Sequence, residues 1–346
     1  MNIEAAIIEL EALPLLGAQK RYAQELADRI ALQIDPDANP SFALRLMIRR
    51  FEASPLTADS IAQLATAEAW ASAEGEHHIA TRLQLLWCRY VGLTDPEAVP
   101  MEVLSEAVAH AQKSGGLDAE WRLAMAAVHP NRNIELREEA LSHLSQVSDI
   151  HHQLQVHMEL ATDRMHGADS DGAFAELSAA LHIAEKQQDP EALGVCATRI
   201  GLHHLQRGRT TEARPHLEHA LTLAQDSADD LNIVMLATLL SAIYLQANEP
   251  KATANMADLL LISGARRGNW FAVVDGHITH SSLSLLFGNN AEAVERLVRA
   301  CLRLRSLVPA AAINLLKGRL SEIRSTLGAE EFDRHHEAAL RAHTKE

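Results

Sequence analysis

Histidine is the residue type with the most evident chemical potential in this chain, because 19 of its 346 residues are histidines. Two pairs have the spacing that places both imidazoles on one helix face, as metal ligands require: His216 with His219, and His277 with His280 near Asp275. A zinc site needs further ligands, and neither pair has them at a recognisable spacing. We therefore predict structural or solvated histidines and no bound metal or cofactor, with a pH-sensitive interface as the alternative.

Sequence motifs for nucleotide or acyl chemistry are absent from the chain. It contains no G-x-S-x-G, no P-loop and no G-x-G-x-x-G. The runs SGG at 114–116 and GNN at 288–290 are typical of turns between helices, and acidic pairs such as Glu138 and Glu139 are typical of a helix surface. The sequence therefore predicts a protein that is not an enzyme. A hydrolase or metal-binding protein built from His and Asp is the remote alternative.

The composition predicts a soluble protein that does not bind nucleic acid or membranes. Its net charge of -15 repels nucleic acid and anionic lipid on average. Cys88, Cys196 and Cys301 lie far apart in apolar surroundings, as buried reduced thiols do. The first residues carry acids within an apolar run, unlike a secretory signal, and no apolar run is long enough to span a membrane. These features predict a cytoplasmic location.

Four residue slots recur at intervals of 40 residues in the later part of the chain. The segment 208–221 reads GRTTEARPHLEHAL and the segment 288–301 reads GNNAEAVERLVRAC, with Gly, Ala, Leu and Ala in the same relative positions. The first slot is filled in turn by Ala168, Gly208, Asn248, Gly288 and Gly328. Internal periods of about 20 to 50 residues are typical of stacked supersecondary units.

The spacing of the slots predicts pairs of helices. The later slots, such as Ala213 and Leu217, fall on one helix face, where small residues let a neighbouring helix approach closely. The first slot precedes this helix and needs a backbone that tolerates a tight turn. Another apolar-periodic segment, such as 192–206, lies upstream of each turn. Helix starts are expected at Asp95-Pro96, at Asp189-Pro190 and at Asn290.

This pattern resembles the tetratricopeptide repeat (TPR). Ile200 and Gly201 fill the Leu-Gly slot of that family, and the four recurring slots follow at its spacing. His204 stands where the family usually has Tyr, whereas in the next unit Tyr244 occupies that slot and Ser241 replaces the Gly. The period exceeds the ~34 residues of the family, so the resemblance implies a long-helix variant. HEAT and armadillo repeats, with periods of about 40 residues, are the competing families.

The resemblance implies an all-α fold, a right-handed superhelical solenoid of antiparallel helix hairpins. We expect one continuous solenoid over residues 1–346 with about nine hairpins. Degenerate repeats are expected over 1–113, an irregular repeat over 114–153, the best-matching repeats over 154–327 and a capping helix over 328–346. Asp333 and Glu337 replace apolar slots in the last segment, which gives it the polar face that a capping helix needs.

The resemblance also implies which residues line the concave groove, because in TPR arrays this surface is formed by the first helix of each unit. In the later units the corresponding residues are Met158, Thr162, Thr198, Leu202, Met235, Thr238, Leu245 and Ile278. In the earlier units they are Arg45, Arg49, Arg82, Arg89 and Arg122. The apolar set suits an apolar peptide or helix, and the arginines favour carboxylates. The alternatives are packing between helices and salt bridges with neighbouring acids.

These features predict a non-enzymatic adaptor or scaffold that binds a partner protein or peptide in the groove. Stacked helices present a long surface but no buried polar pocket built for chemistry. The partner would carry an acidic segment beside an apolar helix. The alternative function is a peptide or small-molecule sensor that regulates a partner.

Overall fold

The computed structural model describes residues 3–13, 17–36, 38–53, 58–147 and 149–343, so the two ends of the expected solenoid lie outside the described residues. Within these residues the regular elements are eighteen α-helices and one short 3-10 helix, which confirms the expected all-α fold. The chain divides into two compact units, Met1–Cys196 and Ala197–Glu346, with the boundary inside α11 (Pro190–Gln206). The expectation of one continuous solenoid stays a prediction.

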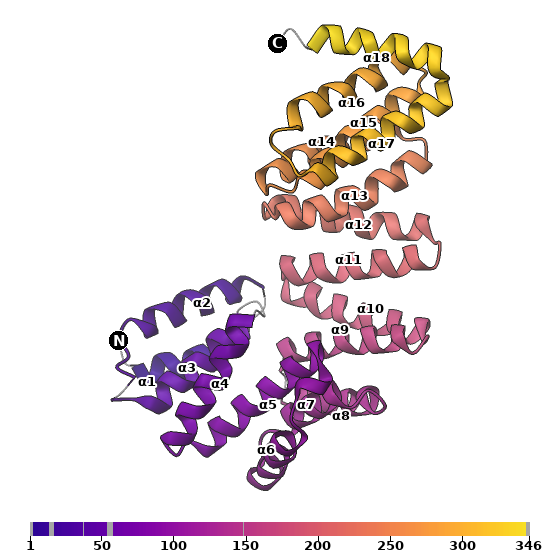
Figure 1. Cartoon of the computed structure of the whole chain (residues 1–346). Helices are drawn as coiled ribbons and strands as arrows, with labels where there is room; N and C mark the ends of the chain where they lie inside the picture. Colours follow the sequence, from indigo (N-terminus) through magenta and orange to yellow (C-terminus); the bar gives the residue numbers. More distant parts are fainter. Residues whose placement is uncertain (1–2, 14–16, 37, 54–57, 148, 344–346) are drawn as a thin grey trace. The chain divides into compact units, whose positions relative to one another are not determined.

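The first unit is a stack of antiparallel helices (Figure 1). Its α-helices are α1 (Ile3–Ala12), α2 (Gly17–Ala31), α3 (Pro40–Ala53), α4 (Ala58–Ala73), α5 (His77–Thr94), α6 (Met101–Ser114), α7 (Asp118–Val128), α8 (Asn133–Gln146), α9 (Ile150–His166) and α10 (Ser170–Gln187). Successive helices contact each other, and α1 also contacts α3, α3 contacts α5, and α5 contacts α7. Contacts of this kind let neighbouring hairpins share one core. The short α7 lies in the segment that was expected to be irregular.

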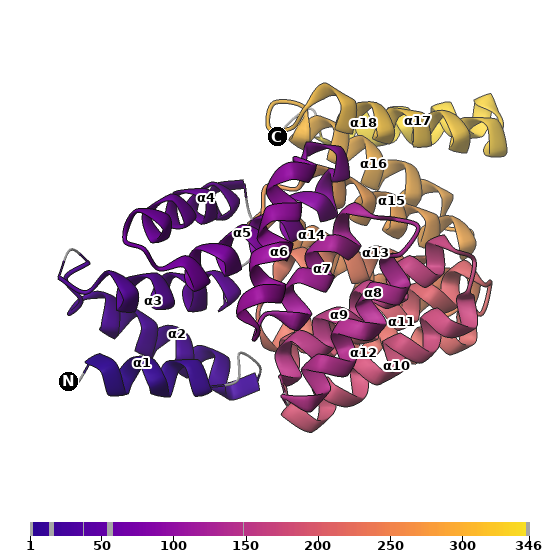
Figure 2. The same cartoon turned by 90° about the horizontal axis from the view of Figure 1, so that it is seen from below.

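The helices of the second unit are similar in length, 15 to 18 residues each. They are α12 (Thr210–Asp226), α13 (Asp230–Gln246), α14 (Pro250–Arg266), α15 (Trp270–Leu286), α16 (Asn290–Leu304), α17 (Ala310–Leu327) and α18 (Ala329–His343). In both views α18 lies at the end of this unit farthest from α12 (Figures 1 and 2), and α13 contacts α15 as α15 contacts α17. None of the helices in the described ranges is both long and apolar enough to cross a membrane.

Left-handed backbone at the turns explains the first slot of the sequence pattern. Its five residues, Ala168, Gly208, Asn248, Gly288 and Gly328, all have positive φ, between 57° and 85°. Glycine adopts this conformation without strain, and Asn tolerates it better than most residues. The turns before the first helices of the hairpins use the same conformation at Gln188, Ala228 and Gly268. The slot therefore marks a chain reversal, as its residue types predicted.

Small residues permit the close approach of helices within the hairpins. Ala173, Ala213 and Ala293 are fully buried. Gly201 on α11 lies so close to α12 that an added Cβ would come within 2.6 Å of two side-chain carbons of Leu217. Real Cβ atoms do not approach carbon so closely, so this contact requires glycine unless the helices move apart.

A helix begins at each of the three expected starts, but only Asp189 caps an α-helix as expected. The Asp189 carboxylate accepts hydrogen bonds from the N–H groups of Glu191 and Ala192, at 3.0 and 3.1 Å, and caps α11. Asp95 instead caps the 3-10 helix η1 (Pro96–Ala98), because α6 begins only after Pro100. Asn290 is the first residue of α16 rather than its cap, and its amide donates to Glu331 across the end of the array.

Candidate partner-binding surfaces

The five arginines expected in the groove are each paired with carboxylates of the chain itself. The pairs are Arg45 with Glu11, Arg49 with Glu52, Arg82 with Glu52 and Glu120, Arg89 with Glu159, and Arg122 with Asp118 and Glu139. All of these residues lie in the first unit. Their mutual repulsion is therefore offset within that unit, which is the salt-bridge alternative rather than a demand for an acidic ligand.

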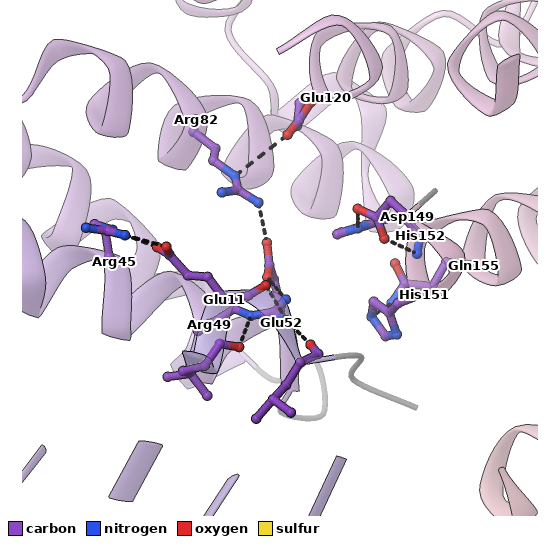
Figure 3. Close-up of polar contacts among 12 residues, drawn as sticks. Glu11, Arg45, Arg49, Glu52, Arg82, Glu120, Asp149, His151, His152 and Gln155 are labelled. Atoms are coloured by element: carbon purple, nitrogen blue, oxygen red, sulfur yellow. Dashed lines mark hydrogen bonds and ion pairs between the residues drawn. The ribbon is translucent and has the colours of Figure 1, made fainter. Parts of the chain in front are cut away.

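Glu52 at the end of α3 is the centre of one cluster (Figure 3). Its buried carboxylate accepts from Arg49 Nη1 at 3.0 Å and from Arg82 Nη2 of α5 at 2.7 Å. Arg49 also donates to the backbone oxygen of Leu10, at 3.3 Å. Burial alone would raise the pKa of Glu52, but Arg82, His152 and Arg49 together lower it below its ordinary value. One ionised carboxylate thus ties α3 to α5, while Arg49 ties α3 to α1.

Arg89 belongs to a second cluster that is shielded from solvent. Its side chain is 3% exposed, and its Nη2 donates to Glu159 at 2.6 Å. Arg137 of α8, equally buried, donates to the other oxygen of Glu159 at 2.9 Å. The expectation that Arg89 faces an accessible groove is therefore wrong. Its long side chain extends into the helix layer, where it pairs with the half-buried carboxylate of Glu159.

A small pocket lies between the two clusters. Its polar lining consists of Glu52, Arg82, Arg89, Glu120, Asp149 and His152, and apolar side chains of α5, α7 and α8 complete it. The pocket has a volume of about 20 Å³, which suits one or two waters or the tip of a side chain. Pockets that enclose drug-sized ligands measure about 300 to 1,000 Å³. This pocket therefore does not have the size of a metabolite site.

The start of α9 contributes an Asp–His pair to the pocket wall (Figure 3). Asp149 caps the helix by accepting from the His152 N–H, and its second oxygen lies 2.7 Å from His152 Nδ1. Burial would raise the pKa of Asp149, but its contacts with His152 lower it to about 2. The carboxylate therefore holds the proton of His152 on Nδ1 and leaves Nε2 as an acceptor when the ring is neutral.

Exposed apolar side chains form a surface on the first helices of the hairpins in the second unit. Leu231 and Met235 of α13, Phe271 of α15 and Leu315 of α17 are 54%, 38%, 50% and 49% exposed. Leu231 and Phe271 occupy equivalent places in the first turns of α13 and α15, and Met235 and Leu315 in the second turns of α13 and α17. Equivalent places in stacked hairpins lie on one face. We name these four residues the apolar face.

The apolar residues expected in the groove divide between this face and the interior. Met235 and Thr238 are exposed, whereas Thr162, Thr198, Leu202, Leu245 and Ile278 are half-buried. Met158 is buried, with its sulfur 3.8 Å from Cys196 Sγ, so the expectation that it lines an open groove is wrong. Partner contacts by the remaining residues stay a prediction. Leu231, Phe271 and Leu315 were not among the expected residues.

His216, His277 and His280 of the two histidine pairs are half-buried, whereas His219 is exposed. His280 Nε2 lies 2.8 Å from Asp258, and the rings of His204 and His216 stack at 5.8 Å. Burial, together with Arg296, His280 and Arg299, lowers the pKa of His277 to about 4, which favours its neutral form. No group of three or more His, Cys, Asp or Glu side chains within the described ranges is arranged to hold a metal ion.

Comparison with known proteins identifies the fold. No protein-family model and no curated protein matches the chain. A STAND ATPase with a tetratricopeptide repeat sensor from Pyrococcus horikoshii is similar in structure, with 13% identity and a TM-score of 0.52 over 93% of this chain and 52% of that protein. This chain therefore spans about half the length of that protein.

Two further solved structures are similar over nearly their whole length. A Rap protein complexed with competence and sporulation factor has 14% identity and a TM-score of 0.51, over 94% of this chain and 99% of that one. Aspartyl phosphate phosphatase F from Bacillus subtilis has 12% identity and a TM-score of 0.49, over 94% of each chain. At such identities the likeness shows the fold alone, a TPR-like helical repeat.

Proposed function

We propose that the chain is a protein-interaction adaptor that binds an apolar segment of a partner protein or peptide on the apolar face. The observation that carries this proposal is that large exposed apolar side chains recur at the second residue of α13 and α15 and at the sixth residue of α13 and α17. Exposed apolar side chains that cluster on one face are typical of interaction sites, whereas single ones are common on any surface. A helix with apolar residues along one side fits such a row.

Similar structures, the repeat spacing and the arginine pairs each bear on the proposal. The Rap structure contains a bound factor, and the Pyrococcus horikoshii protein is described as having a repeat sensor, which supports binding as the task of this fold. The regular 40-residue spacing supports the long-helix variant of the TPR family. The proposal does not include an acidic segment in the partner. The arginines that suggested such a segment are paired with Glu and Asp of the chain itself.

Site-specific photo-crosslinking tests the proposed surface. p-Benzoylphenylalanine replaces Met235 or Phe271 in cells of the source organism, and crosslinked proteins are identified by mass spectrometry. The control places the same group at Asn255, an exposed residue of α14 outside the apolar face. We expect one protein to be captured from both face positions and not from Asn255. Equal capture from Asn255, or none from Met235 and Phe271, would remove the apolar face as the binding surface.

A sensor that regulates a partner remains the alternative function. It predicts that a peptide or metabolite raises the melting temperature of the purified chain by itself. An adaptor is stabilised only by its partner or by a peptide copied from the segment of the partner that binds, and not by a metabolite. A thermal-shift screen with peptides and metabolites separates the two functions.

A further inference from the structure

We propose that the pocket between the two arginine clusters of the first unit binds a primary carboxamide, the side chain of an Asn or Gln residue of the partner. This inference rests on the proposed function only for the source of the amide. The pocket itself belongs to the first unit, whereas the apolar face belongs to the second.

Two arginines that line this pocket each have a donor that is not used. The Nε–H groups of Arg82 and Arg89 are both buried, and neither has a hydrogen-bond acceptor in the part of the chain that the structure describes. One terminal nitrogen of each arginine, Nη2, donates to a carboxylate, of Glu52 for Arg82 and of Glu159 for Arg89, which restrains the guanidinium groups. A buried donor without an acceptor is destabilising, so a carbonyl oxygen placed within reach of these N–H groups is stabilising.

Acceptors line the same pocket. Glu120 makes one ion pair among the described residues, with Arg82 Nε at 3.7 Å, which is too long for a hydrogen bond. In the neutral ring of His152, the Nε2 atom is a second acceptor, because Asp149 lies 2.7 Å from Nδ1 and accepts the hydrogen bond of that nitrogen. An amide NH2 group donates two hydrogen bonds, and Glu120 and His152 can accept them.

The charge of the lining favours a neutral amide over a carboxylate. Three carboxylates, of Glu52, Glu120 and Asp149, line the pocket with two guanidinium groups that are already paired. The carboxylate of a ligand would be repelled by these three carboxylates. It would also have no N–H or O–H group to donate to Glu120. An amide satisfies both the donors and the acceptors without adding charge. Its three heavy atoms also suit a pocket of about 20 Å³.

Methyl NMR titrations of the full chain test this assignment with three probes. N-acetylglutamine methylamide represents a Gln residue in a peptide, N-acetylglutamate methylamide is its charged isostere, and free L-glutamine represents an amino acid. The readout is the shift of the Leu85, Ala119 and Leu123 methyl groups, which line the pocket. We expect saturable shifts with blocked glutamine, and binding about tenfold weaker with each of the other two probes.

A pair of variants distinguishes recognition from non-specific contact. Glu120→Gln replaces the charged acceptor on a partly exposed side chain, and we expect it to weaken blocked-glutamine binding about tenfold. Glu106→Gln changes an exposed acid of α6 outside the pocket, and we expect unchanged binding. Circular dichroism confirms that each variant is folded.

The remaining outcomes would overturn the proposal in distinct ways. Tighter binding of blocked glutamate would make the pocket an anion site, and tighter binding of free glutamine would make the ligand an amino acid. The absence of shifts with every probe would leave only water in the pocket. None of these outcomes affects the apolar face, because the probes carry no apolar helix and the crosslinking experiment does not use the pocket.

Discussion

Two carboxylates of the first unit each hold two arginines in contacts that are largely removed from solvent. Glu52, with a side chain 2% exposed, compensates two arginines at once, and Glu159 does the same for Arg89 and Arg137. Buried ion pairs add little stability compared with apolar packing, but losing one partner leaves an uncompensated charge. In this unit the ion pairs fix positions, because they hold the guanidinium groups of Arg82 and Arg89 beside the pocket.

Replacing Glu52 tests how much the first cluster depends on one carboxylate. Glu52→Gln leaves Arg49 and Arg82 without their shared anion, and we expect a loss of about 3 to 5 kcal/mol in the free energy of unfolding. The matched change Asp28→Asn removes the partner of Arg50 in an exposed pair and should have little effect. Urea unfolding near neutral pH measures both variants. Equal effects would mean that Glu52 is hydrated in solution.

We expect the folded chain to lose stability in weak acid because of His151. Burial, aided by the charge of His152, lowers its pKa to about 4, whereas an unfolded His titrates near ~6.5. The unfolded chain therefore binds the proton first as the pH falls. The stability present above about pH 6.5 is lost towards pH 4, with about 2 kcal/mol of the loss between pH 7 and pH 5.

The variant His151→Gln isolates this contribution to the pH dependence. Gln does not titrate, so we expect the difference in unfolding free energy between about pH 7 and about pH 5 to shrink by about 2 kcal/mol. The exposed His78→Gln is the control and should leave the difference unchanged. An unchanged difference in both variants would show that the His151 ring is solvated in the folded state.

At the scale of the elements, the sequence predicts whatever depends on local chemistry. The turns at Gly208 and Gly288 could be predicted because glycine is the residue that left-handed backbone favours. The turns at Gln188 and Ala228 adopt the same conformation without such a signal, since neighbouring helices impose it. The carboxylate partner of Arg89 could not be predicted because it comes from a helix that is distant in the sequence. Glu159 reaches Arg89 from a helix 70 residues further along the chain.

Two helical glycines give a direct test of the predicted close approach. Gly201→Ala places a Cβ within 2.6 Å of Leu217 and should cost about 1 to 3 kcal/mol through overpacking of α11 against α12. Gly318→Ala, in α17 with no atom within 4 Å of the new Cβ, should stabilise the chain by about 0.5 to 1 kcal/mol. Melting temperatures that rise in both variants would mean that α11 and α12 pack less closely than their coordinates indicate.

At the scale of the whole molecule, stability is distributed along the chain rather than around one centre. Leu83 is fully buried in the cluster formed by α3, α4 and α5, and Leu260 in the cluster formed mainly by α12, α13 and α14. Each cluster is built from helices that are close in sequence. In stacked repeats, stability is approximately a sum of local terms and nearest-neighbour contacts. A cavity in one cluster should therefore weaken its own unit much more than the other.

Hydrogen exchange measured by mass spectrometry tests this distribution with two equivalent cavities. Leu260→Ala should cost about 2 to 5 kcal/mol locally and accelerate exchange in α12 to α15, with α3 to α5 close to the parent chain. Leu83→Ala should give the opposite pattern, so each variant is the control for the other. If either substitution accelerates exchange equally in both units, the chain unfolds as one cooperative body. The apolar face and the carboxamide pocket would then unfold with the same free energy. Binding of a ligand at one of them would slow hydrogen exchange at the other.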